Sequence, residues 1–107
     1  MSTTQYNKLV RDRIPEIIEA SGKRFVCFTL SDEEYLARLD EKLNEELAEY
    51  QESKSMEERA DLLEVIRAVA IARGSSIEEV EAIRRDKAVK RGGFEKKILL
   101  TEVTTDD

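Results

Sequence analysis

Apolar residues recur every three or four positions along two stretches in the middle of the chain, which is the spacing of one face of an α-helix. In residues 32–52 this stripe consists of Leu36, Leu39, Leu43, Leu47 and Tyr50. In residues 56–73 it consists of Leu62, Val65, Ile66 and Val69. A turn of about two polar residues separates the stretches, so the pattern predicts a central antiparallel helical hairpin.

Capping residues bound these helices and predict two more. A serine followed three residues later by glutamate forms a capping box, and it occurs at Ser31, Ser55 and Ser76. Pro15 lies in the first turn of a helix expected over residues 14–20. The helices are expected to end before the glycines Gly22, Gly74 and Gly92–Gly93. We therefore expect a mainly α fold of four helices, in one domain covering residues 1–107.

Two short segments are rich in β-branched and aromatic or aliphatic residues instead. Residues 24–30 read RFVCFTL, and residues 98–103 contain ILL followed by Val103. These compositions are typical of strands. The sequence thus predicts a small two-stranded β element beside the helices.

Four carboxylates lie on or beside the faces that the hairpin should bury. At about 100° per residue, Glu46 falls inside the apolar arc of its helix, Glu49 lies at the edge of that arc, and Glu45 points away. On the following helix, Glu58 and Asp61 lie on or beside the core face. No cation shares their stripes, and unpaired buried carboxylates are very costly, so a bound ion is expected to neutralise them.

Oxygen ligands without histidine or cysteine suit a hard cation, Mg²⁺ first and Mn²⁺ second. The 107-residue chain contains no histidine, which excludes histidine-dependent triads and zinc sites. Its lone cysteine, Cys27, fits a reducing cytoplasm. No apolar run approaches the ~20 residues of a membrane span. The net charge of −6 argues against a nucleic-acid partner.

The charge is unevenly distributed along the sequence. Residues 31–64 carry thirteen acidic and four basic side chains, whereas residues 84–97 carry seven basic and two acidic ones. An acidic middle and a basic tail are compatible with mutual neutralisation on the surface, and also with a metal site and a phosphate clamp.

The segment EELAE at residues 45–49, followed by ERAD at residues 58–61, resembles the EExxE…ExxD signature of MazG-type nucleoside-triphosphate pyrophosphohydrolases. The segments YNKLVRDRIP at residues 6–15 and KAVKRGGF at residues 87–94 are similar to a compact, house-cleaning branch of that family. The resemblance implies an all-α NTP pyrophosphatase fold. It also implies hydrolysis of a noncanonical nucleoside triphosphate between its α and β phosphates, giving a monophosphate and pyrophosphate.

The resemblance also implies residue roles. The metal ligands would be Glu46, Glu49, Glu58 and Asp61, with Glu45 or Glu49 as the base that activates water. Cations are needed for the leaving pyrophosphate, and glycine lets backbone amides approach a phosphate. The candidates for substrate binding are Lys8, Arg11, Arg13, Lys87, Lys90, Arg91 and Gly93.

Two alternatives remain open from the sequence: a phosphoribosyl-ATP pyrophosphohydrolase, and a non-catalytic acidic helical interaction module. The third helix bears on assembly, because Leu63, Ala70 and Ile71 make it apolar beyond its main face. A helix that is apolar nearly all round requires burial on several sides. We therefore expect a homodimer or a dimer of dimers.

Overall fold

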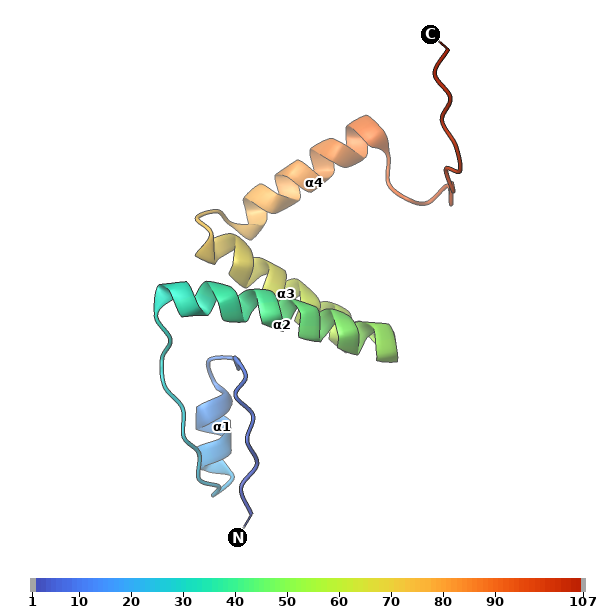
Figure 1. Cartoon of the computed structure of the whole chain (residues 1–107). Coiled ribbons are helices and arrows are strands. Elements are labelled where there is room, and N and C mark those ends of the chain that lie inside the picture. Colours follow the sequence, from blue (N-terminus) through green and yellow to red (C-terminus); the bar gives the residue numbers. More distant parts are fainter. Residues whose placement is uncertain (1, 107) are drawn as a thin grey trace. The chain divides into compact units, whose positions relative to one another are not determined.

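The computed structural model describes residues 2–106, and within that range the chain is mainly helical (Figure 1). The elements are α1 (Ile14–Ala20), α2 (Asp32–Ser53), α3 (Met56–Ala72) and α4 (Ile77–Arg91). These bounds agree with the prediction to within two residues at each end. None of the helices in the described range is both long and apolar enough to cross a membrane.

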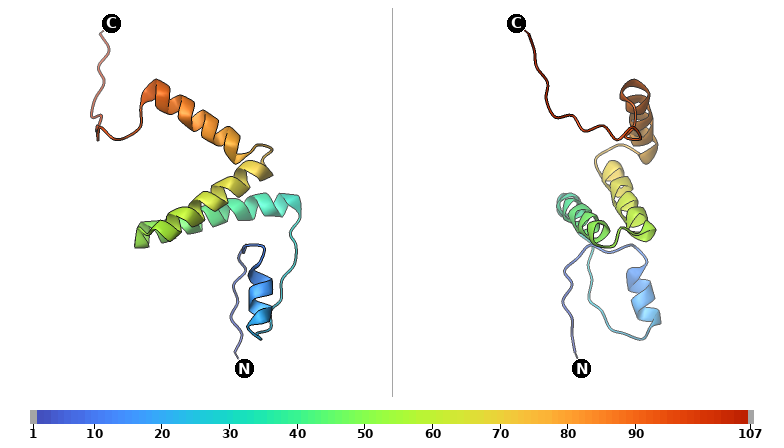
Figure 2. Two further views of the ribbon diagram at one scale, coloured as in Figure 1. Left: turned by 180° about the vertical axis from the view of Figure 1, so that it is seen from behind. Right: turned by 90° about the vertical axis from the view of Figure 1, so that its right-hand side faces the viewer.

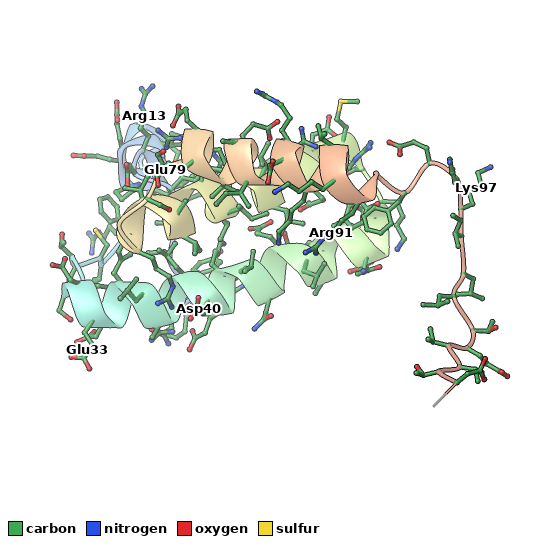
Figure 3. All side chains as sticks on the ribbon, turned by 90° about the horizontal axis from the view of Figure 1, so that it is seen from above. Arg13, Glu33, Asp40, Glu79, Arg91 and Lys97 are labelled. Carbon is green, nitrogen blue, oxygen red and sulfur yellow. The ribbon has the colours of Figure 1, made fainter. Side chains whose placement is uncertain are left out.

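Helices α2 and α3 form the predicted antiparallel hairpin and pack against each other. They overlap in Figure 1 and lie side by side in the right-hand view of Figure 2. The connection is tight because Lys54, the C-cap of α2, takes a left-handed conformation with φ of 58°. At the other end of the hairpin, Arg73 after α3 pairs with Asp40 of α2 at 3.2 Å. Glu33, in the first turn of α2, points away from the rest of the hairpin (Figure 3).

Serine caps begin both helices of the hairpin, as the capping boxes predicted. Ser31 Oγ accepts a hydrogen bond from the Glu34 backbone N–H at 3.2 Å, and Ser55 Oγ accepts one from the Glu58 N–H at 3.2 Å. Each cap contributes about 1 kcal/mol by satisfying an amide that the helix leaves unpaired. The Ser55 cap also fixes the first turn of α3, which carries Glu58.

The core of the hairpin is thin. Among the described residues, the buried apolar side chains are Leu39, Val65 and Ala70. Leu39 and Val65 belong to the predicted stripes, whereas Ala70 was expected off the main face of its helix. The one buried charged residue in this range is Glu46, which is 6% exposed. A charged group in so small a core indicates that this part of the hairpin has a role other than packing.

Contacts divide the chain into two compact units, Met1–Ile77 and Glu78–Asp107. The first contains the hairpin and α1, which begins at Ile14 with Pro15 in its first turn. The second contains nearly all of α4 and the segment that follows it. Helix α4 ends at Arg91, and Gly92 follows with φ of 84°, a conformation that favours glycine. Arg91 and Lys97 mark the helix end and the irregular segment (Figure 3). The single domain over residues 1–107 stays a prediction.

The predicted two-stranded β element is absent from residues 2–106, so that prediction was wrong. Residues 24–30 belong to the first unit and residues 98–103 to the second, and neither segment forms a ladder. Most of their apolar side chains are exposed: Val26 is 98% exposed and Leu99 is 85% exposed. Strand propensity depends on a partner strand and a face to bury, and composition alone supplied neither.

Candidate metal centre

Three carboxylates converge in the half of the hairpin nearer its turn. Glu46 approaches from α2, and Glu58 and Asp61 approach from successive turns of α3. One oxygen from each lies within 4.8 Å of one from each of the others. Oxygens around an octahedral Mg²⁺ are about 3.0 Å apart when neighbouring and about 4.2 Å apart when opposite, so the three carboxylates are close enough to share one ion after side-chain rotation draws them together.

Two oxygens of this group lack any donor. Glu46 Oε2 and Glu58 Oε2 are buried, and neither has a hydrogen-bond partner within the described part of the chain. A buried carboxylate oxygen without a donor is destabilising unless a cation compensates for it. Because the unpaired atoms are carboxylate oxygens with no nitrogen or sulfur ligand beside them, they fit a hard divalent cation.

The pKa values of the two glutamates reflect the same crowding. Burial and the facing Glu49 carboxylate raise the pKa of Glu46 above its ordinary value, although Lys42 opposes the change. Burial, Glu49 and Asp61 raise the pKa of Glu58. Both groups therefore resist ionisation in the absence of a cation, as expected for carboxylates that are partly desolvated and close to other carboxylates.

Glu49 lies beside these carboxylates, although it is not one of the three that converge within 4.8 Å. Its proposed role as a fourth ligand stays a prediction. Glu64 is the natural comparison on α3. Its side chain is 46% exposed and pairs with Arg67 at 3.6 Å on the outer face. The helical phase therefore separated inward Glu46 from outward Glu64 correctly.

Lys42 is a residue of this site that the sequence interpretation missed. Its ammonium lies 3.4 Å from Glu46 Oε1 and 3.3 Å from Glu45 Oε1, and its side chain is only 20% exposed. The expectation that no cation shares the stripe was therefore wrong. Residues four apart face each other on a helix, so the spacing of Lys42 and Glu46 was the signal that identifies it. Lys42 contacts Oε1 of Glu46, whereas Oε2 of Glu46 has no partner among the described residues.

Glu45 has a different environment from its neighbour. Burial alone would raise its pKa, but hydrogen bonds and charge from Lys8 and Lys42 outweigh burial and lower the pKa. Lys8 Nζ lies 3.3 Å from Glu45 Oε1. A carboxylate held in its charged form by two cations is a weak proton acceptor. This environment makes Glu45 a poor choice for a general base.

The structure brings two of the predicted N-terminal cations to the hairpin. Lys8 contacts Glu45 as described, and Arg11 Nη2 lies 2.7 Å from Asp61 Oδ1. Arg13 instead pairs with Glu16 on exposed α1, at 3.1 Å. Lys8 and Arg11 are thus next to the carboxylate group, whereas Arg13 contacts its own helix.

The predicted C-terminal cations and glycine belong to the second unit. Lys90 pairs with Asp86 at 3.2 Å within α4. Lys87 and Arg91 are exposed in the last turns of that helix, and Gly93 follows it. Cations at a helix C-terminus interact favourably with the helix dipole, which accounts for their position without a ligand. Phosphate binding by these residues stays a prediction.

Comparison with known proteins gives a partial match to a protein without a described function. The chain is 67% identical to an uncharacterized protein of Mycolicibacterium smegmatis over 42 residues, which are 39% of this chain and 43% of that protein. The match therefore spans less than half of the relative. No family model matches the chain. No solved structure matches it either.

Proposed function

We propose that this protein is a magnesium-dependent nucleoside-triphosphate pyrophosphohydrolase of the MazG-like class. It would hydrolyse a noncanonical nucleoside triphosphate to a monophosphate and pyrophosphate in the cytoplasm. The observation that carries the proposal is the meeting of Glu46, Glu58 and Asp61, with two buried oxygens that no donor of residues 2–106 reaches. A helical interaction surface gains nothing from such an arrangement, because it destabilises the folded state unless a cation binds.

Each residue near the site has a role in this proposal. Glu46, Glu58 and Asp61 hold the cation, with Glu49 at their side as a further ligand or as the proton acceptor. When bound, a divalent ion polarises phosphate oxygens and lowers the pKa of water. Glu49 is preferred to Glu45 as the base, because Lys8 and Lys42 keep Glu45 in ion pairs. Lys42 positions Glu46 through Oε1.

The reaction then depends on positioning and charge rather than on a covalent intermediate. A triphosphate adds several negative charges to an already acidic hairpin, so cations must approach from the protein. Lys8 and Arg11 are held at that place by contacts to Glu45 and Asp61. Lys87, Lys90, Arg91 and Gly93 remain candidates from the second unit.

The test is product analysis with a panel of nucleoside triphosphates, including base-modified ones and phosphoribosyl-ATP. We expect magnesium-dependent formation of monophosphate and pyrophosphate from at least one nucleoside triphosphate, and none after EDTA treatment. Turnover confined to phosphoribosyl-ATP would instead identify the histidine-biosynthesis reaction. A folded protein that binds no divalent cation and turns over no nucleotide would favour the interaction module.

We also propose that the active form is a homodimer or a dimer of dimers. Leu63 is 57% exposed and Ile71 is 51% exposed on α3, so the hairpin offers apolar surface that a second hairpin would bury. Four helices from two chains would form a bundle core larger than one hairpin provides.

A further inference from the structure

Arg11 and Asp61 are 50 residues apart in sequence, yet their side chains form one of the shortest ion pairs of the described residues, at 2.7 Å. Asp61 is also one of the three carboxylates that converge at the candidate metal centre. The negative charge of Asp61 can therefore pair either with Arg11 or with a bound cation. An arginine that satisfies Asp61 reduces what Asp61 offers to a divalent cation.

The segment that carries Arg11 has a second attachment. Three residues earlier, Lys8 contacts Glu45 of α2 at 3.3 Å, and Arg38 donates a hydrogen bond to the Asn7 carbonyl at 3.3 Å. Glu45 is not among the converging carboxylates. Residues 7–11 thus contact α2 through residues outside the metal centre, and they contact α3 through Asp61 of the metal centre.

Arg11 does not remove the need for a cation at this place. Its side chain is 58% exposed and pairs with Asp61, which is itself 39% exposed. Glu46 lies deeper, at 6% exposure, and its Oε2 has no donor among the described residues. Lys42 pairs with Oε1 of Glu46, but Oε2 of Glu46 and Oε2 of Glu58 have no partner among the described residues. A divalent cation would supply the charge that neither Lys42 nor the exposed guanidinium brings to these two oxygens.

We infer that Arg11 is an exchangeable counter-charge: it holds Asp61 in the metal-free protein, and it is released to bind phosphate oxygens of the substrate once Asp61 engages a divalent cation. The Lys8–Glu45 pair keeps the segment in place during this exchange. This inference rests on the proposed function. It assigns to Arg11 both a competition with metal and a contact with substrate, and it makes triphosphate binding depend on prior occupation of the metal centre.

The energetics permit the exchange. Exposed ion pairs contribute little, because both partners are well hydrated when separated. The Arg11–Asp61 pair is therefore easily replaced by a cation that also satisfies Glu46 and Glu58. A released guanidinium is suited to its second role, since its planar array of donors matches two phosphate oxygens at once.

The first measurement is a magnesium titration of the whole protein without nucleotide, by calorimetry at 0.15 M salt. Arg11→Gln should bind magnesium about two- to fivefold more tightly than wild type, because it removes a competitor of the strength typical of exposed pairs. Arg13→Gln removes the same charge from the same segment, but Arg13 pairs with Glu16. Its magnesium affinity should equal that of wild type.

The second measurement is binding of inorganic pyrophosphate at saturating magnesium. Arg11→Gln should bind it about tenfold more weakly, as expected for loss of a hydrogen bond between charged groups. Arg11→Lys keeps the charge without the planar donors. Its affinities for magnesium and for pyrophosphate should each lie between those of wild type and Arg11→Gln. Circular dichroism of each variant verifies that the exposed substitution leaves the helices intact.

The outcomes separate the two proposals. Wild type that binds no magnesium rejects the proposed function, and the exchange with it. Magnesium binding that is equal or weaker in Arg11→Gln overturns the exchange alone, since Arg11 would then support Asp61 rather than compete. The exchange is also wrong if Arg13→Gln tightens magnesium binding equally, or if pyrophosphate affinity does not depend on Arg11.

Discussion

Replacing Glu46 with glutamine should change the stability of the protein in opposite directions with and without magnesium. Glu46 is buried, its Oε2 has no donor within the part of the chain that the structure describes, and its pKa is raised by burial and by Glu49. Glutamine has nearly the same volume but carries no charge. In the metal-free protein at pH 8 the variant should therefore melt above wild type. With magnesium it should gain little, because a ligand has been removed.

The magnitude follows from binding linkage. At free magnesium ten times its dissociation constant, an ion that binds only the folded state adds about 1.4 kcal/mol. For a domain of this size, that raises the Tm by roughly 6–11 °C. Glu46→Gln should lose most of this rise. Lys42 retains Glu45 as a partner at 3.3 Å, so the variant creates no new unpaired cation.

Thermal melts of both proteins in EDTA and in magnesium provide the assay. Glu64→Gln is the matched control, because Glu64 is exposed on α3 and pairs with Arg67. It should follow wild type in both buffers. A Glu46→Gln protein that is less stable than wild type without metal, yet responds fully to magnesium, would refute the reasoning.

Three further predictions follow from the same contacts. Because the folded-state pKa of Glu46 is raised above 4.5, the charge of Glu46 costs stability above that raised value and none below about 4.5. The metal-free Tm difference between Glu46→Gln and wild type should therefore shrink as the pH falls from 8 toward 4.5, and a difference that grows would contradict this. Ser55→Ala and Ser31→Ala should each lose about 1 kcal/mol of stability in denaturant melts. Only Ser55→Ala should also weaken magnesium binding, because the Ser55 cap holds the turn that carries Glu58. Equal magnesium affinities of the two variants would show that the Ser55 cap does not support the metal centre. Light scattering should show a dimer or tetramer at micromolar concentration, whereas a fully active monomer of 12.3 kDa would exclude the proposed assembly.

Helix positions were predictable because local signals agree with one another. The apolar spacing marks the length of each helix. The serine caps at Ser31 and Ser55 and the glycines that follow the helices mark their ends. The same periodicity distinguished Glu46 from Glu64. The β element failed for the opposite reason: residues 24–30 and 98–103 have strand composition, but pairing depends on distant parts of the chain.

The cations that pair with the carboxylate group, Lys42 and Arg11, were less predictable from the sequence than the helices. Lys42 was detectable from its spacing to Glu46, since side chains four apart meet on a helix. The contact between Arg11 and Asp61 was not, because 50 residues separate them and no periodicity relates an irregular N-terminal segment to a helix face. Both residues were candidates from the sequence, Arg11 for phosphate and Asp61 for metal, but only the fold brings them into contact.

The decisive experiment for a metal-dependent pyrophosphohydrolase compares magnesium-dependent pyrophosphate release by wild type, Glu58→Gln and Glu64→Gln at equal folded concentration. Both substitutions lie on α3 and remove one charge, but Glu58 faces the carboxylate group and Glu64 faces outward. The account predicts that Glu58→Gln abolishes release from a nucleoside triphosphate that wild type hydrolyses, while Glu64→Gln remains nearly as active as wild type. Equal activity of the two variants would contradict it.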